Sequence, residues 1–174
     1  MPYCGPMPKL YIVSGLPYAG KSVLSRELVR RFGFGYASVD DEITNGGYDV
    51  VTMTQPDWND VYTRAYDRLE VLLRSGDTVV FDGASLTRHE RDTMRKIATE
   101  CGAEAVLVYV DTSAAVTAER RTRNLSTQER AHLQDVTMRT ALDLFQEPTA
   151  DERPVRYNAG MDLDTWVSTH IATE

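Results

Sequence analysis

Residues 15–22 read Gly15-Leu16-Pro17-Tyr18-Ala19-Gly20-Lys21-Ser22, which is the pattern G-x-x-x-x-G-K-S. The residues before it, K-L-Y-I-V-S at 9–14, are typical of a short buried strand. The residues after it, 22–32, place apolar side chains at the spacing of an amphipathic helix. A strand, a glycine-containing turn and a helix in this order are the setting in which this pattern binds phosphate groups.

The residue types at the fixed positions suit a nucleotide's phosphates. The two glycines allow backbone angles that a side chain would forbid, so the main-chain N–H groups can approach the anion. Lys21 is expected to reach the β- and γ-phosphates, and the Ser22 hydroxyl is expected to hold Mg²⁺. An ordinary turn before a helix would need neither residue. We therefore predict nucleotide contacts from Gly15, Pro17, Tyr18, Ala19, Gly20, Lys21, Ser22 and Val23.

Length and composition indicate one globular unit. The chain has 174 residues, 42% of them hydrophobic and 26% charged. These values fit a single domain over residues 9–174, after a loose tail at 1–8 that contains three prolines. The net charge of −7 argues against broad binding to nucleic acid or to anionic membranes.

The cysteine spacing and the hydropathy of the chain indicate the cellular compartment in which the protein is expected. Cys4 and Cys101 form no C-x-x-C pair, so neither a metal cluster nor a disulfide framework is indicated. No apolar run approaches the roughly 20 residues that a membrane span needs. The first residues lack the features of a signal peptide. We expect a cytoplasmic protein with no membrane partner.

Strand-like and helix-like segments alternate along the chain. The pattern predicts an α/β protein of the three-layer P-loop class, with a five-stranded, mostly parallel sheet, helices on both faces and a small lid. Residues 44–56 are expected to form a loop, and the stretch 44–58 is expected to help form the acceptor's pocket, although no residue in it is diagnostic. The expected strands are 9–14, 36–39, 78–81, 105–110 and 155–158. The expected helices are 22–32, 57–74, 87–101, 113–123, 126–145 and 162–171. Capping-box patterns at Thr87-x-x-Glu90 and Ser126-x-x-Glu129 open two of them, and Asp57 and Asp162 are expected to cap two others.

Two acidic residues follow predicted strands at the edge where ligands bind such sheets. Asp82 follows T-V-V-F and could hold Mg²⁺ through water beside Ser22, or it could merely cap the next turn. Asp40 follows the second strand and could accept a proton from a substrate hydroxyl or orient that hydroxyl. With Asp41 and Glu42, it could instead belong to a solvated acidic loop.

An arginine-rich segment follows the fourth strand. Arg120, Arg121 and Arg123 lie in one predicted helix end, with Arg130 just beyond. Positioned guanidinium groups stabilise the negative charge that spreads over a transferring phosphoryl group. We predict a lid at about 118–130 that supplies Arg123 first and Arg120 second. The alternative is a solvated basic helix end that complements the helix dipole.

Three further arginines could contact an acceptor. Arg88, Arg91 and Arg95 follow one another at spacings of three and four residues, so they share a helix face. Arg88 is nearest the end of the third strand, and we assign it to substrate binding. For Arg95, an ordinary surface position is the favoured interpretation.

Longer stretches of the chain resemble a known family. The N-K-x-D signature of GTPases is absent. The chain resembles the small ATP-dependent P-loop kinases related to phage polynucleotide kinase, zeta toxin and chloramphenicol phosphotransferase. The matching stretches are G-L-P-Y-A-G-K-S, S-V-D-D-E, V-V-F-D-G-A-S-L-T-R-H-E-R, V-L-V-Y-V-D-T and E-R-R-T-R-N. The resemblance implies ATP and Mg²⁺ bound by Lys21 and Ser22, a hydroxyl contacted by Asp40, and a phosphoryl group stabilised by Arg123.

The resemblance implies a reaction more firmly than a substrate. Phage polynucleotide kinase has an arginine three residues after its catalytic aspartate, where this chain has Ile43. We therefore expect an ATP- and Mg²⁺-dependent kinase that phosphorylates a hydroxyl of a small molecule. Nucleic acid is not favoured as acceptor, but a polynucleotide 5′-hydroxyl kinase stays an alternative. Another is an ATP-binding switch or weak ATPase without a transfer reaction.

Overall fold

A parallel sheet forms the middle of the molecule. The computed structural model describes residues 7–129 and 132–171. Within them, five strands pair in the order β2-β3-β1-β4-β5, every pair parallel. The strands are β1 (Lys9–Ser14), β2 (Gly35–Ser38), β3 (Val79–Asp82), β4 (Glu104–Val110) and β5 (Val155–Tyr157). The predicted α/β class, with a parallel sheet between helices, is confirmed.

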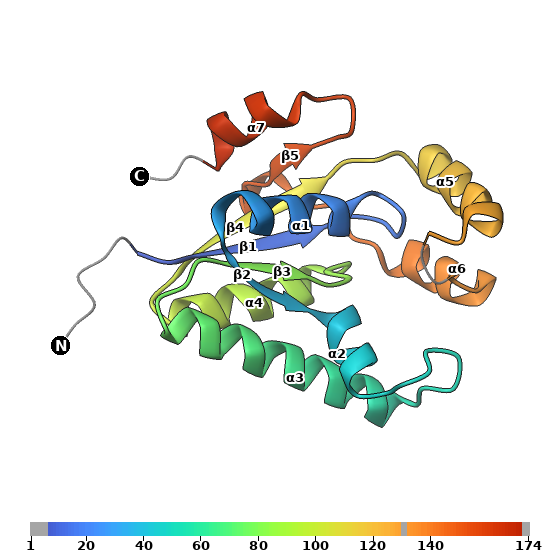
Figure 1. The fold of residues 1–174 in the computed structure, drawn as a ribbon, viewed down its shortest axis with the longest axis horizontal. Helices are drawn as coiled ribbons and strands as arrows, with labels where there is room; N and C mark the ends of the chain where they lie inside the picture. The colour runs from blue at the N-terminus through green and yellow to red at the C-terminus, as the bar shows by residue number, and fades with distance from the viewer. Residues whose placement is uncertain (1–6, 130–131, 172–174) are drawn as a thin grey trace.

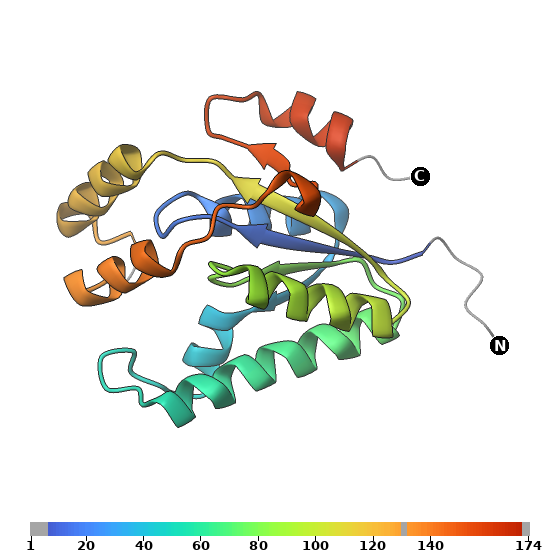
Figure 2. The same cartoon turned by 180° about the vertical axis from the view of Figure 1, so that it is seen from behind.

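Helices cover both faces of the sheet (Figures 1 and 2). α1 (Lys21–Phe32) and α7 (Leu163–His170) lie on one face, and α3 (Gln55–Arg74) and α4 (Arg88–Glu100) lie on the other. At the carboxyl ends of the strands lie α2 (Val39–Asn45), α5 (Ala114–Thr127) and α6 (Asp135–Leu144). A short 3-10 turn, Ala150–Glu152, precedes β5. The arrangement leaves the strand ends between α2 and the α5–α6 pair.

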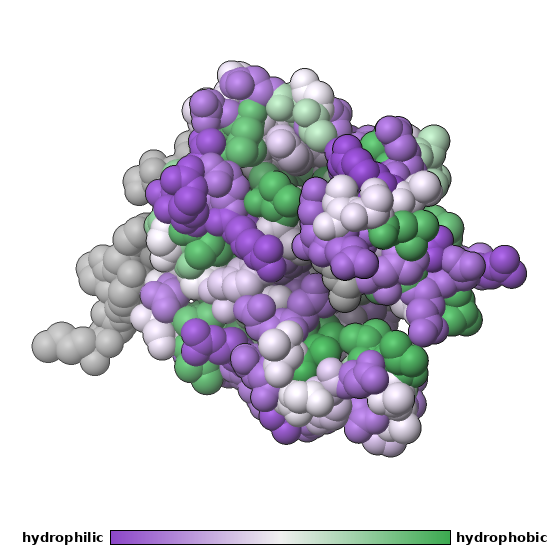
Figure 3. Space-filling view, turned by 45° about the vertical axis from the view of Figure 1, so that its right-hand side comes forward, coloured by the Kyte–Doolittle hydropathy of each residue, from purple (hydrophilic) through white to green (hydrophobic). Residues whose placement is uncertain are grey.

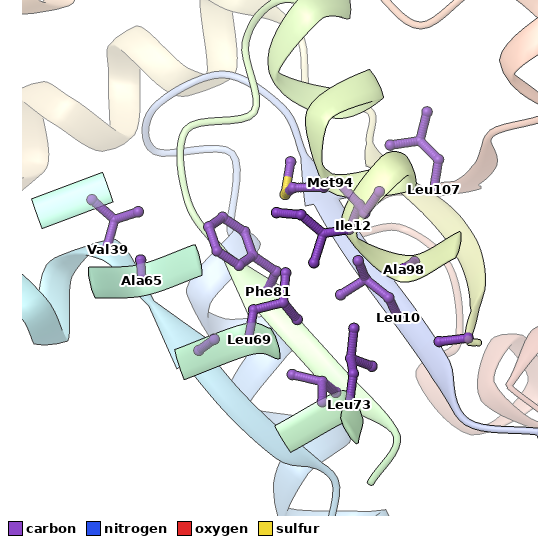
Figure 4. Packing of buried hydrophobic residues seen from close by; sticks show 14 of the residues in the cluster. Leu10, Ile12, Val39, Ala65, Leu69, Leu73, Phe81, Met94, Ala98 and Leu107 are labelled. Carbon is purple, nitrogen blue, oxygen red and sulfur yellow. The ribbon is translucent and has the colours of Figure 1, made fainter. Parts of the chain in front are cut away.

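Alternation along β1 builds a core on each side of the sheet. Leu10 and Ile12 pack with Leu69, Phe81 and other residues of α3, α4 and β3 (Figure 4). Tyr11 and Val13 point the other way and pack with residues of α1 and α7. Successive strand side chains face opposite sides of a sheet, so one buried strand serves both layers. This double burial explains the continuous apolar run before the glycine motif.

The segment after the second strand differs from its prediction. β2 ends at Ser38, and Asp40 lies in the first turn of α2 instead of at the strand end. The Ser38 hydroxyl accepts the N–H of Asp41 at 3.3 Å and so caps the helix. Acidic side chains in a first turn stabilise a helix through its dipole. The acidic run that suggested a loop thus begins a helix.

Two other helix starts were placed wrongly. α3 begins at Gln55 with Thr54 as N-cap, and Asp57 closes the capping box by accepting the Thr54 N–H at 2.7 Å. A second capping box, expected at 126–129, does not form. Ser126 instead donates to the carbonyl of Arg123, and α5 ends where Gln128 adopts a left-handed conformation with φ 49°. α6 starts later, after Gln134. Arg130 lies outside the described residues.

The length and hydropathy of the helices show whether any of them could span a membrane. Among the residues that the structure describes, no helix is both long and apolar enough to span a bilayer.

Candidate active site

The glycine motif forms a tight loop between β1 and α1. Gly15 has φ 153°, and a Cβ atom there would lie 2.8 Å from the carbonyl oxygen of Val110. Gly20 caps α1 with φ 108°. Tyr18 also has a positive φ, 63°, although it carries a side chain. Each of the two positions therefore requires glycine for its own reason. Gly15 packs closely against Val110, and Gly20 adopts a left-handed backbone conformation.

The ammonium group of Lys21 lies over this loop. Its Nζ donates to the carbonyl oxygens of Gly15 at 2.9 Å and Leu16 at 3.0 Å. The charge is therefore held beside the N-terminus of α1, where main-chain N–H groups favour anions. Loop, lysine and helix terminus together form an anion-binding arrangement.

Residues after β4 support the loop from outside. Arg120 donates from Nη1 to the carbonyls of Tyr18 at 3.1 Å and Ala19 at 2.8 Å. Thr112 donates to the same Ala19 carbonyl at 3.0 Å. The Tyr18 hydroxyl in turn accepts the N–H of Leu133 at 3.2 Å. The contacts join α5 and the segment before α6 directly to the glycine loop.

The two leading lid arginines have different surroundings. Arg120 is half-buried against the loop, whereas Arg123, one turn further along α5, is exposed. Arg121 fixes the start of α6, because it donates to the Leu133 carbonyl at 2.8 Å and pairs with Asp135. Arg120 therefore contacts the loop backbone, and the exposed Arg123 follows it one turn later in the same helix.

Asp82 lies buried at the end of β3, with 7% of its surface exposed. The Tyr36 hydroxyl donates to its carboxylate at 2.7 Å. Burial raises the pKa of Asp82, although hydrogen bonds from Tyr36 and Ser22 and the charge of Lys21 oppose the rise. Asp82, Ser22 and Lys21 therefore meet at one place, as the sequence predicted for the end of this strand.

The oxygen atoms at this place suit Mg²⁺. Magnesium prefers carboxylate and hydroxyl oxygens, binds through few protein ligands and keeps water and phosphate oxygens as the others. Ser22 and Asp82 supply one oxygen-bearing side chain each, next to the anion-binding loop. Within the described part of the chain, no cluster of three or more His, Cys, Asp or Glu side chains could hold a metal by itself. The residues fit a cation shared with phosphates.

Asp40 lines the same cavity as these groups. The cavity has a volume of about 420 Å³, and its polar end contains Lys21, Ser22, Asp40 and Asp82. Its remaining lining comes mainly from α2, α3, the segment after β3, and α6, including Trp58, Tyr62, Leu86, Val136 and Leu144. The sequence predicts the four polar residues at one edge and a contribution to the acceptor's pocket from residues 44–58, of which Val50 and Trp58 line the cavity. The walls from the rest of α3 and from α6 were not predicted.

The arginines of α4 do not form the anion-binding face that their spacing suggested. Arg88 is not among the described residues that line the cavity, and it pairs with Asp92 at 3.0 Å and Asp151 at 2.9 Å. Arg91 is fully buried and donates to both carboxylate oxygens of Glu152 at 2.8 Å. Arg91 therefore has a structural role, because it joins α4 to Glu152 in the 3-10 turn before β5. Substrate binding by Arg88 stays a prediction.

Comparison with known families identifies the chain. Residues 10–148 match the model of the AAA_33 family, described as an AAA domain. The chain belongs to the AAA_33 family. The resemblance to small P-loop kinases is thereby confirmed at the level of the family and the fold. No curated protein shows a significant sequence match.

Solved structures similar to this AAA_33 member include several kinases. A sugar kinase from Janibacter sp. HTCC2649 superposes with a TM-score of 0.66 at 14% identity, covering 95% of this chain and 93% of that one. A gluconokinase from Sinorhizobium meliloti 1021 gives 0.63 at 21%, covering 92% and 88%. The Mycobacterium tuberculosis APS kinase CysC, in complex with AMPPNP and APS, gives 0.67 at 19%, covering 96% and 97%. At these identities the likeness shows a shared α/β P-loop fold.

Proposed function

We propose that this AAA_33 protein is an ATP- and Mg²⁺-dependent phosphotransferase that phosphorylates a hydroxyl group of a small molecule. One observation carries the proposal: Asp40 shares a cavity with Lys21, Ser22 and Asp82. A carboxylate beside a phosphate-binding loop and a magnesium-type oxygen pair is the arrangement that phosphoryl transfer to a hydroxyl requires. Kinases of the same fold, one of them in complex with AMPPNP, support the proposal.

The protein's own groups would act in sequence. The loop N–H groups and the Lys21 ammonium hold the triphosphate, and Lys21 exchanges its two carbonyl contacts for phosphate oxygens. Mg²⁺ at Ser22 and Asp82 would supply charge neutralisation on the phosphates. Asp40 accepts the acceptor's hydroxyl proton as the oxygen bonds to the γ-phosphorus. The bond from that phosphorus to the bridging oxygen breaks, and ADP leaves.

The lid is part of the same proposal. Arg123 lies exposed on α5, and closure of the lid at about 118–130 would bring its guanidinium to the γ-phosphate. Arg120 would follow as the second contributor, because it already rests on the loop backbone. Closure would also exclude water, which otherwise competes with the acceptor for the phosphoryl group.

Replacing Lys21 by Ala tests nucleotide binding. The change removes a charge-assisted contact to phosphate, and we expect the affinity for AMPPNP with Mg²⁺ to fall at least about tenfold. Isothermal titration calorimetry measures the affinity, and circular dichroism checks the fold. Lys96→Ala is the matched control, because Lys96 is 76% exposed on α4 and pairs only loosely with Glu100 at 3.8 Å. Wild-type affinity in Lys21→Ala would contradict the assignment.

Release of ADP tests transfer. We expect ADP formation from ATP to depend on an added alcohol. Hydrolysis at one slow rate with every acceptor would instead indicate a switch or weak ATPase. Transfer of labelled γ-phosphate to an oligonucleotide with a free 5′-hydroxyl would indicate a polynucleotide kinase.

A further inference from the structure

The walls of the Asp40 cavity are apolar and aromatic. α3 contributes Trp58 and Tyr62, whose ring centroids lie 6.5 Å apart. Tyr62 continues to Tyr66 at 6.0 Å, and Tyr66 stacks on Phe81 of β3 at 5.7 Å. This row of rings reaches from the cavity into the hydrophobic core. The core therefore fixes the aromatic wall, and a flat apolar group can pack against it without reorganisation.

The opposite wall leaves large apolar side chains in contact with solvent. On α6, Val136 is 67% exposed and Leu144 is 50% exposed, and both line the cavity. Across the cavity, Val50 in the segment between α2 and α3 is 40% exposed. Figure 3 shows hydrophobic residues on this side of the molecule in separate groups, with polar surface between them. An occupant with an apolar body would remove these side chains from water, which is favourable.

The charges of the cavity disfavour an anionic occupant. Among the described lining residues, Lys21 is the one cation, and the proposed reaction assigns it to the phosphates of ATP. Asp40 and Asp82 make the floor acidic. Arg88, the predicted anion contact, is held by Asp92 and Asp151 outside the lining. A carboxylate, sulfate or phosphate on the acceptor would therefore meet like charge without a cation of its own.

Polar contacts for an uncharged acceptor are few and lie among the rings. Burial raises the pKa of Tyr62, so its hydroxyl stays protonated as a donor. Thr137 and Thr140 of α6 add hydroxyl groups on the other side. A polyhydroxylated sugar needs a hydrogen-bond partner for most of its oxygens once it leaves water. The cavity walls offer such a molecule mainly apolar side chains and few hydrogen-bond partners.

We propose that the acceptor is an uncharged alcohol with a mainly apolar, ring-containing body. Its ring packs between the α3 aromatic wall and α6, and its hydroxyl points to Asp40. The inference rests on the proposed function and specifies its substrate class. The alcohol loses its proton to Asp40, and its oxygen forms the new bond to the γ-phosphorus while the bond from that phosphorus to the bridging oxygen breaks. The products are ADP and the phosphate monoester of the alcohol.

A matched pair of probes tests the charge preference. 4-Methylbenzyl alcohol and 4-(hydroxymethyl)benzoate have nearly the same shape and differ by one carboxylate. Larger neutral one- and two-ring alcohols, D-gluconate and a 5′-hydroxyl oligonucleotide complete the panel. Calorimetry in the presence of AMPPNP and Mg²⁺ measures binding. Trp58 fluorescence, with Trp58→Phe as blank, reports binding at the α3 wall. We expect the neutral member of the pair to bind at least about tenfold more tightly. Equal or tighter binding of the benzoate or gluconate, or no binding by any neutral alcohol, overturns the inference.

Two leucines on one helix test the position of the apolar body. Leu144 and Leu142 are 50% and 41% exposed on α6, but only Leu144 is among the described residues that line the cavity. We expect Leu144→Asp to weaken binding of the neutral alcohol by about tenfold or more, with AMPPNP affinity unchanged. Leu142→Asp should bind as the wild type does. Equal effects of the two substitutions, or none in Leu144→Asp, overturn the inference.

The two readouts separate this inference from the proposed function. Neutral alcohols that bind at Trp58 but never release ADP from ATP would refute the transfer reaction and leave the binding preference standing. Phosphorylation of gluconate or of the oligonucleotide in preference to the neutral alcohols would keep the phosphotransferase and overturn the acceptor class.

Discussion

Asp40→Asn is expected to slow phosphoryl transfer by about 10²- to 10⁴-fold while leaving ATP affinity near that of the wild type. The amide has the shape of the carboxylate but cannot accept the hydroxyl proton. Asp40 is exposed in the first turn of α2. The helix cap is made by Ser38 to the main chain of Asp41, so the substitution leaves that cap in place. The loss should therefore appear in kcat and not in the fold.

The measurement is the steady-state rate of acceptor-dependent ADP formation, with calorimetry for AMPPNP. Asp41→Asn is the matched control, because Asp41 is also exposed in the first turn of α2 but is not among the described residues lining the cavity. It should keep the wild-type rate. If Asp40→Asn transfers phosphate at an undiminished rate, or if both variants lose activity equally, Asp40 has no role as the base.

The polar residues of the site could be predicted from the sequence, because local patterns identify them. Lys21 and Ser22 belong to a spaced motif, and Asp82 follows an apolar strand in a fold whose strand ends share an edge. The apolar walls had no such signal. Trp58 and Tyr62 at helical spacing predict a buried helix face whether they line a cavity or a core. Their partners on α6 are more than 70 residues away in the chain.

The helix boundaries also show that local sequence patterns cannot predict a feature that a tertiary contact determines. The helix starts at Thr87, Ser113 and Asp162 were predicted correctly, and in the structure each of these side chains caps its helix by accepting a main-chain N–H. The pattern at 126–129 is equally good but fails, since α5 continues through Ser126 and then ends at Gln128. Arg121 bonds to the Leu133 carbonyl and Asp135, which fixes where α6 begins. That contact is tertiary and has no trace in the local sequence.

Arg91→Met is expected to lower the free energy of unfolding by about 3 kcal/mol, at the low end of the 3–5 kcal/mol typical of breaking a buried ion pair. The Arg91 side chain is 0% exposed and that of Glu152 is 1% exposed. The substitution leaves this carboxylate buried with Arg95 at 2.8 Å and the Thr149 N–H at 3.2 Å as hydrogen-bond partners, and with Arg88 at 3.8 Å. It also removes the donor to the carbonyls of Ser85 and Leu86. Chemical denaturation measures the loss, and Arg64→Met, which breaks an exposed pair with Asp60, should cost far less.

Acidification gives this prediction a second, independent readout. Burial alone would raise the pKa of Glu152, but hydrogen bonds from Arg91 and Arg95 outweigh it and lower that pKa to about 2. A carboxylate whose pKa is lowered by folding adds stability above its unfolded pKa of about 4.5 and loses it as the pH falls toward about 2. The stability difference between wild type and Arg91→Met should therefore shrink across that range. A difference that stays constant from neutral pH to pH 2 would mean that lost packing, and not the ion pair with Glu152, accounts for the destabilisation.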